Sequence, residues 1–76
     1  MTNQDIARKL RDHAKEMSSR SENLYRVRAF RRAAMVVMGM NEEVAALVRH
    51  GDRRALEAVP GIGKSLADTI AQFTNN

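Results

Sequence analysis

The sequence has no cysteine and no tryptophan, and it contains a single proline. Without cysteine, neither disulfides nor thiolate metal sites are available. No charge-free apolar run approaches the roughly 20 residues that a membrane-spanning helix needs, and no secretory signal opens the chain. These absences predict a soluble intracellular protein with no membrane partner.

Strand patterns are missing as well, and no connection is long enough to hold a lid or a second domain. Apolar residues instead recur at helical spacing along most of the 76 residues. We therefore expect an all-α fold. It should be a compact bundle of four to five short helices in a single domain, residues 1–76.

The first two helices are predicted from their caps and apolar stripes. Thr2 and Asp5 form a capping-box pattern at the start of the first helix. The second helix is expected to be capped by Ser21 or Asn23 and to end near Gly39. Its core face should carry Val27, Phe30, Ala34, Val37 and Met38.

Shorter helices are predicted in the second half of the chain. Asn41 is expected to cap a third helix, which Gly51 stops. A short helical turn then leads to Pro60, and the last helix begins at Gly63. This last helix should bury Leu66, Ile70 and Phe73.

Methionines and histidines are predicted to be structural. Three methionines should fill gaps in the small core, with an interaction surface as the alternative: Met35, Met38 and Met40. The two histidines lack the partner spacing of a metal site. We expect His13 on the surface of the first helix and His50 in the basic last turn of the third helix.

Positive charge is concentrated in one segment. The net charge is +4, and five arginines between positions 20 and 32 face a single acid, Glu22. These arginines are Arg20, Arg26, Arg28, Arg31 and Arg32. A solvated helix face is one interpretation. The one-sided clustering favours the other, a polyanionic partner that arginine can bind through its phosphates.

The stretch "VPGIGKS" could belong to either of two kinds of phosphate site, a nucleotide-binding P-loop or a hairpin between two helices. A nucleotide-binding P-loop needs glycine at the position of Ala58, and Pro60 removes an amide donor that such a loop would use. That interpretation is rejected. A tight hairpin between two helices instead needs positive φ angles, which we expect at both Gly61 and Gly63. Ile62 should plug this hairpin into the core.

The helix after this hairpin predicts an anion site. Its first backbone N–H groups lack intrahelical acceptors, and Lys64 lies beside them. The helix dipole also favours negative charge there. Ala67 would let the two hairpin helices approach closely. The expected ligand is a sugar-phosphate backbone, bound without regard to base sequence.

Pro-Gly-apolar-Gly in this context is the pattern of the helix-hairpin-helix motif. The segments "IARKL", "NLYRVRAFRRAA" and "VPGIGKSLADTIAQF" together resemble the amino-terminal small domain of the family X, or polymerase-beta-like, DNA polymerases. The resemblance extends from Asp5 to Phe73. It implies a helical module that grips the 5′-phosphate side of a gap or nick during repair or replication.

The resemblance also implies the binding residues and their ligands. The hairpin would contribute Gly61, Ile62, Gly63, Lys64 and Ser65, and the arginine helix Tyr25, Arg26, Arg28, Arg31 and Arg32. Tyr25 would stack on a base, with capping of the core as its alternative role. Carbonyl oxygens near Val59 and Gly61 would hold Na⁺ or K⁺, with no other cofactor. The partners would be single-stranded, gapped or double-stranded DNA and a separate repair or polymerase protein, in the cytoplasm or, in a prokaryote, at the nucleoid.

Enzymatic activity is not expected. Some relatives are lyases whose lysine attacks a deoxyribose-phosphate sugar, but its position here is Thr69, which has no amine. Lys64 is the alternative amine for a residual lyase activity. Polymerase activity would need paired aspartates for two metals, and no Asp-x-Asp occurs. An adaptor that binds proteins through the same scaffold is the remaining alternative.

Overall fold

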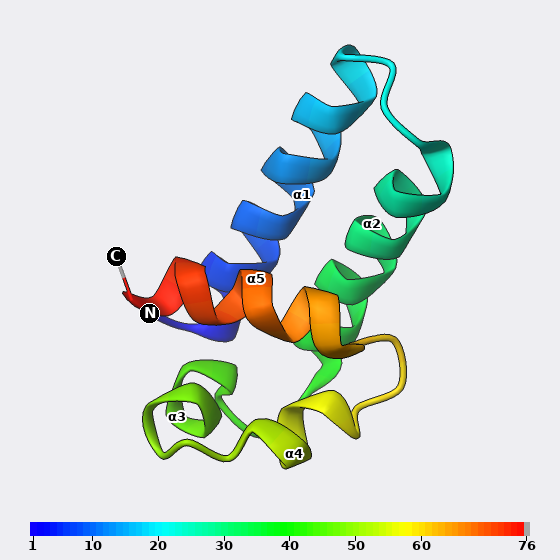
Figure 1. The fold of residues 1–76 in the computed structure, drawn as a ribbon. Helices are drawn as coiled ribbons and strands as arrows, with labels where there is room; N and C mark the ends of the chain where they lie inside the picture. The colour runs from blue at the N-terminus through cyan, green and yellow to red at the C-terminus, as the bar shows by residue number, and fades with distance from the viewer. Residues whose placement is uncertain (76) are drawn as a thin grey trace.

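The computed structural model describes residues 1–75, which contain five helices and no strand. The helices are α1 (Asn3–Ser19), α2 (Leu24–Gly39), α3 (Val44–Arg49), α4 (Arg53–Glu57) and α5 (Lys64–Asn75). Figure 1 shows α1 and α2 as an antiparallel pair, with α5 running across it and α3 and α4 at one end. The predicted all-α fold and its helix number are confirmed. Within these residues, no helix combines the length and hydropathy needed to span a membrane.

One hydrophobic core is shared by all five helices and the hairpin. Its largest fully buried side chains are Ile6, Leu10, Val27, Val37, Val44, Leu56, Ile62 and Ile70. Burying such a side chain contributes about 1.5–3 kcal/mol. The radius of gyration is 11.6 Å, close to the roughly 11.4 Å expected for a compact chain of this length.

Both ends of α1 are closed by local hydrogen bonds. The Thr2 hydroxyl accepts the Asp5 amide at 3.1 Å, and the Asp5 carboxylate accepts the Thr2 amide at 3.0 Å, so the predicted capping box is confirmed. The hydrogen bond from the Thr2 backbone lowers the pKa of Asp5. At the other end Ser21 adopts φ 58°, and the Glu22 amide bonds the Met17 carbonyl at 3.1 Å, as in a Schellman motif.

The predicted core face of α2 is correct except at Met38. Asn23, not Ser21, caps the helix by accepting the Tyr25 amide at 2.9 Å. Val27, Phe30, Ala34 and Val37 are buried, as is Ala33, which was not predicted. Met38 is 47% exposed.

The prediction that the methionines fill core gaps is wrong for two of the three. Met35 is 74% exposed and Met38 is largely exposed, while Met40 alone is partly buried against the core. Helical spacing explains this difference. The buried face of α2 is defined by Val27, Phe30, Ala34 and Val37. Met35 and Met38 lie outside that face.

His13 lies in an aromatic cluster and is partly exposed, so the predicted surface position is confirmed only in part. Its ring centroid is 4.9 Å from that of Phe30 and 6.4 Å from that of Phe73. These three rings come from α1, α2 and α5, so the crossing of α5 over the helix pair leaves His13 only partly exposed.

A side chain from α1 caps α3, and the predicted cap Asn41 does not. The Asn3 carboxamide oxygen accepts the Val44 amide at 2.7 Å, while its nitrogen donates to the Glu42 carbonyl at 2.7 Å. The Asn3 amide also donates to the Glu43 carboxylate at 2.9 Å. Asn3 is 9% exposed, so these bonds satisfy groups that water does not reach freely.

Replacing Asn3 with alanine should therefore destabilise the fold. We expect Asn3→Ala to lower the free energy of unfolding by about 1–3 kcal/mol, because the buried Val44 amide loses its acceptor. Urea unfolding followed by circular dichroism measures the change. Gln4→Ala, at an exposed neighbouring position, is the control and should change stability by less than about 0.5 kcal/mol. Equal effects of the two substitutions would refute the capping role.

Candidate nucleic-acid interface

The connection between α4 and α5 is built around a tight turn. The Ile62 amide donates to the Val59 carbonyl at 2.9 Å, and Gly61 has φ +94°. Proline at the second position and a positive φ at the third are the features of a type II β-turn. The sequence Val59-Pro60-Gly61-Ile62 thus forms this turn for a local reason, and the positive φ predicted at Gly61 is confirmed.

Gly61 also allows the turn to pack tightly against α2. A Cβ at this position would lie 3.1 Å from the Cγ2 atom of Val36 and 3.7 Å from the Nε atom of Arg32. The first distance is shorter than most contacts of real Cβ atoms, so a side chain would push the turn away from α2. The Arg32 side chain consequently lies directly beside the hairpin.

Gly63 differs from Gly61, and the prediction of a positive φ there is wrong. Only Gly51 and Gly61 have positive φ among the glycines of residues 1–75. Gly63 directly precedes α5, so it occupies the N-cap position and already has a conformation that other residues can adopt. A Cβ at Gly63 would meet no atom within 4 Å, so the space beside it is open.

Ile62 and Ala67 anchor the hairpin in the core as predicted. Ile62 is 1% exposed and Ala67 is fully buried. Because the Ile62 amide already donates to Val59, Ile62 holds the turn in place and has no free N–H for a ligand. The amides available to a ligand are those that follow it.

Backbone N–H groups lack an acceptor where α5 begins. The hydrogen bonds among the described residues give no acceptor to the amides of Gly63, Lys64 and Ser65, and all three residues are exposed. Such orphan amides and the positive end of the helix dipole favour an anion. Lys64 adds a full positive charge at the same helix end.

A groove of about 630 Å³ is lined by this hairpin and by α2, beside the point where they touch. One wall consists of the α2 residues Tyr25, Arg28, Ala29 and Arg32, and the other of residues 57–63. The α2 residues recur at helical spacing and so share one face of the helix. The groove therefore places two arginines opposite the hairpin that carries the predicted anion site.

The structure divides the predicted arginines into two groups. Arg28 and Arg32 line the groove, whereas Arg26 and Arg31 do not. The Arg26 guanidinium lies 5.9 Å from the centroid of the Phe30 ring. All four side chains are exposed, and α2 contains no acidic residue.

Tyr25 lines the groove, and its side chain is exposed to solvent. It is 81% exposed, so it does not cap the core, and that alternative is wrong. An exposed aromatic ring beside arginines is a surface on which an unpaired base can stack.

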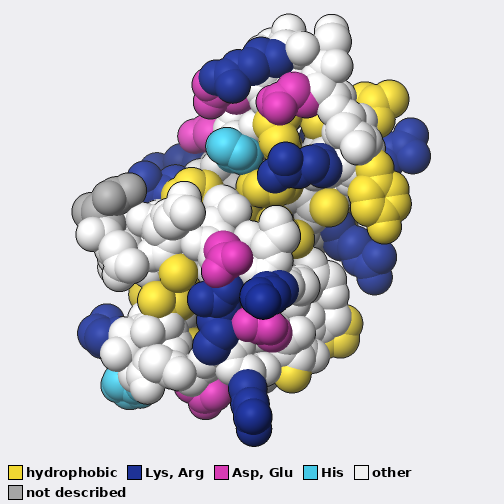
Figure 2. Space-filling view, in the orientation of Figure 1, with side chains coloured by type: hydrophobic (Ala, Val, Ile, Leu, Met, Phe, Trp, Pro, Cys, Tyr) yellow, Lys and Arg dark blue, Asp and Glu magenta, His cyan; other side chains and the backbone are white. Residues whose placement is uncertain are grey.

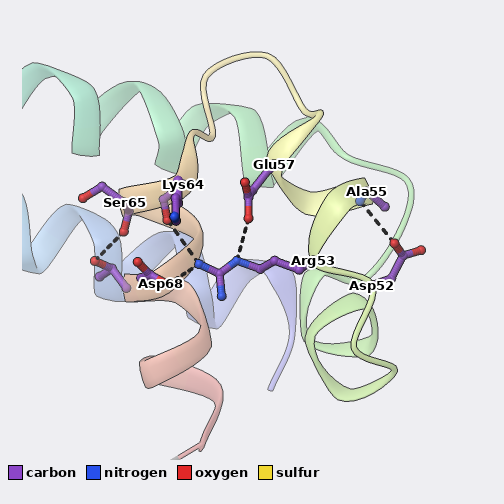
Figure 3. A network of polar contacts seen from close by, with 8 residues as sticks. Asp52, Arg53, Ala55, Glu57, Lys64, Ser65 and Asp68 are labelled. Carbon is purple, nitrogen blue, oxygen red and sulfur yellow. Dashed lines mark hydrogen bonds and ion pairs between the residues drawn. The ribbon is translucent and has the colours of Figure 1, made fainter.

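Arg53 fastens α4 to the first turn of α5 (Figure 3). Its Nη2 atom donates to the Lys64 carbonyl at 3.3 Å and pairs with the Asp68 carboxylate. Its Nε atom lies 2.9 Å from the Glu57 carboxylate, without the alignment of a hydrogen bond. The hydrogen bond with Asp68 raises the pKa of Arg53 further.

No lysine lines the groove among the described residues. Thr69 is partly buried and donates its hydroxyl to the Ser65 carbonyl at 3.2 Å. Lys64 is exposed at the start of α5. In the part of the chain that the structure describes, no three His, Asp or Glu side chains gather as metal ligands.

Two features of the site were not predicted from the sequence. Glu57 lines the groove, and Arg53 forms ion pairs with both Glu57 and Asp68. The spacing of Arg53 and Glu57, four residues on one helix, indicates their pairing. No pattern indicates the pairing with Asp68, which depends on how α4 and α5 pack.

Adding a side chain at Gly61 should loosen the hairpin. We expect Gly61→Ala to destabilise the protein by about 1–3 kcal/mol, because alanine disfavours this φ and its Cβ crowds Val36. Gly39→Ala is the control, since Gly39 ends α2 and has open space around it. It should be neutral or stabilise by up to about 1 kcal/mol. Thermal unfolding of both variants measures the effect. Equal changes in the two melting temperatures would contradict this expectation.

Comparison with known proteins places this chain in a family. The family model described as "Helix-hairpin-helix domain" matches residues 1–76. No significant match was found among curated proteins or among solved structures. Proteins with this domain generally bind DNA without sequence specificity. The matched region includes the α4–α5 hairpin, its buried Ile62 and its free amides, and the chain belongs to the helix-hairpin-helix domain family.

Proposed function

We propose that this protein binds DNA through its phosphate backbone, without reading base sequence, at the groove between α2 and the α4–α5 hairpin. The observation that carries this proposal is the placement of Arg28 and Arg32 across the groove from the hairpin. The exposed amides at the start of α5 adjoin the same groove through Gly63.

The binding mechanism follows from these donors. One phosphate lies at the start of α5, where it accepts hydrogen bonds from the Lys64 and Ser65 amides and is attracted by the helix dipole. Neighbouring phosphates pair with Arg28 and Arg32 through charge-assisted hydrogen bonds. Because these contacts go to phosphate oxygens, they position the DNA without specifying its sequence.

Gapped, nicked or 5′-phosphorylated DNA is the proposed preferred form. The similarity to the small domain of family X polymerases supports this choice, as does the exposed Tyr25 ring at the groove. An unpaired base next to a gap could stack on this ring, whereas bases inside an intact duplex could not. The corresponding role is in DNA repair or replication, together with a separate polymerase or repair protein, in the cytoplasm or at a nucleoid.

The same similarity leads us to propose a monovalent cation at the hairpin carbonyls. The Val59 carbonyl accepts one hydrogen bond, from Ile62, while no donor among the described residues reaches the Gly61 carbonyl. Carbonyl oxygens of this kind suit Na⁺ or K⁺. DNA affinity should accordingly fall when tetramethylammonium replaces these ions at constant ionic strength, and equal affinity in the two solutions would contradict the site.

A protein-binding role is the second candidate, and the exposed apolar residues of α2 favour it. Leu24, Met35 and Met38 are 63%, 74% and 47% exposed and follow helical spacing along one side of α2. Figure 2 shows hydrophobic side chains gathered at the edge of the molecule over α2, with basic side chains beside them. Large exposed apolar groups often mark protein contacts. A partner helix with acidic residues would complement the α2 arginines, so this surface suits the proposed repair or polymerase partner.

The principal test is fluorescence anisotropy with a labelled, 5′-phosphorylated gapped duplex. We expect binding that favours this DNA over intact duplex and single strand. With three phosphate contacts, the logarithm of the affinity should fall with the logarithm of salt concentration at a slope of about −2 to −3. Absence of binding at low salt would exclude the DNA-binding proposal and favour the protein-binding role.

Gly63→Val tests the hairpin itself. The fold has space for this side chain, but the side chain would cover the free amides at the start of α5. We expect unchanged helical circular dichroism and a loss of affinity of about tenfold or more, since charge-assisted hydrogen bonds are worth about 1.5–3 kcal/mol. Gly39→Val, at a position that does not line the groove, is the control for the added volume. Normal DNA binding by Gly63→Val would exclude the hairpin as the phosphate site.

We also propose that the bound 5′ end is held but not cleaved. A Schiff-base lyase needs an amine beside the sugar, and Thr69 supplies none. Borohydride treatment in the presence of DNA with a 5′-deoxyribose-phosphate should yield no covalent adduct. An adduct that disappears in Lys64→Ala would overturn this expectation and assign a lyase role to Lys64.

A further inference from the structure

We propose that Arg53 is a positioning residue for DNA binding, which acts by cancelling the charge of Glu57 and Asp68 and by holding the start of α5 against α4. The inference rests on the proposed function. It assigns to Arg53 a role different from that of Arg28 and Arg32, because Arg53 is basic but its guanidinium is already engaged by protein groups.

The first part of the argument is the position of the Arg53 contacts. Lys64 is the first residue of α5, and its carbonyl accepts the Arg53 Nη2 hydrogen bond at 3.3 Å. Asp68 lies one helical turn further along α5. Arg53 therefore holds the first turn of α5, which carries the free amides, at a defined position relative to α4 (Figure 3).

The second part is electrostatic. Glu57 lines the groove, and Asp68 lies near the helix end at which a phosphate is expected. The side chains of Glu57 and Asp68 are 34% and 54% exposed, so both carboxylates face solvent and would repel an approaching phosphate. A single guanidinium between them reduces this repulsion.

A neighbouring arginine supplies the matched control. Arg54 is exposed on the same short helix, and no ion pair with it is found among the described residues. Arg53→Ala and Arg54→Ala remove the same formal charge, but only the first releases two carboxylates. The double variant Arg53→Ala/Asp68→Asn restores the net charge of the natural sequence and removes one of the released carboxylates.

The experiment compares these variants by anisotropy with the 5′-phosphorylated gapped duplex, after circular dichroism has verified their helices. At low salt we expect Arg53→Ala to weaken binding on the order of tenfold and Arg54→Ala by about twofold or less. The double variant should recover to within about threefold of the natural protein. The deficit of Arg53→Ala relative to the natural protein should shrink as salt rises, because salt screens the repulsion by the two released, exposed carboxylates.

The outcomes separate this inference from the proposed function. If the natural protein does not bind DNA, the proposed function fails. If it binds, and Arg53→Ala weakens binding no more than Arg54→Ala, only the role of Arg53 is refuted. Failure of the double variant to recover would likewise refute the electrostatic role.

If Arg53→Ala does not fold, Arg53→Lys replaces it. This variant keeps the charge, but its lysine cannot reach Glu57 and Asp68 with separate N–H groups. Its binding should fall by about threefold, and unchanged binding would refute the positioning role.

Discussion

The packing of the Val59–Ile62 turn against α2 is the contact on which the rest of the site depends. Ile62 buries its side chain in the core, and Gly61 lets the backbone approach Val36 and Arg32 closely. This contact sets the distance between α2 and the hairpin and therefore the width of the groove. It also sets the direction of α5, because the helix begins two residues after the turn.

The groove combines an apolar base with charged edges. Ala29, Val59, Pro60 and Ile62 contribute apolar surface, whereas Arg28 and Arg32 contribute positive charge and Glu57 negative charge. In the proposed complex, the arginines and the start of α5 attract a phosphate backbone, and Tyr25 offers an aromatic surface beside them. The donors are spread along two elements, as an extended phosphate backbone would require.

A small protein has to use most of its apolar residues for packing, so the different faces of α2 have different roles. Val27, Phe30, Ala34 and Val37 pack into the core, and Tyr25, Arg28 and Arg32 line the groove. The remaining side contains Leu24, Met35 and Met38, which are available to a partner. One helix thus serves the core, the candidate DNA site and an exposed apolar surface through three of its faces.

The sequence by itself determined the features that depend on neighbouring residues. The capping box of Thr2 and Asp5, the end of α2 at Gly39 and the positive φ of Gly61 were predictable, because each is governed by interactions within a few positions. The tertiary structure decided which arginines line the groove, that Asn3 caps α3, and that Arg53 pairs with Asp68. It also decided that His13 packs against Phe73. These contacts join residues far apart in the chain, and they exist only because core packing brings the helices to particular distances and angles.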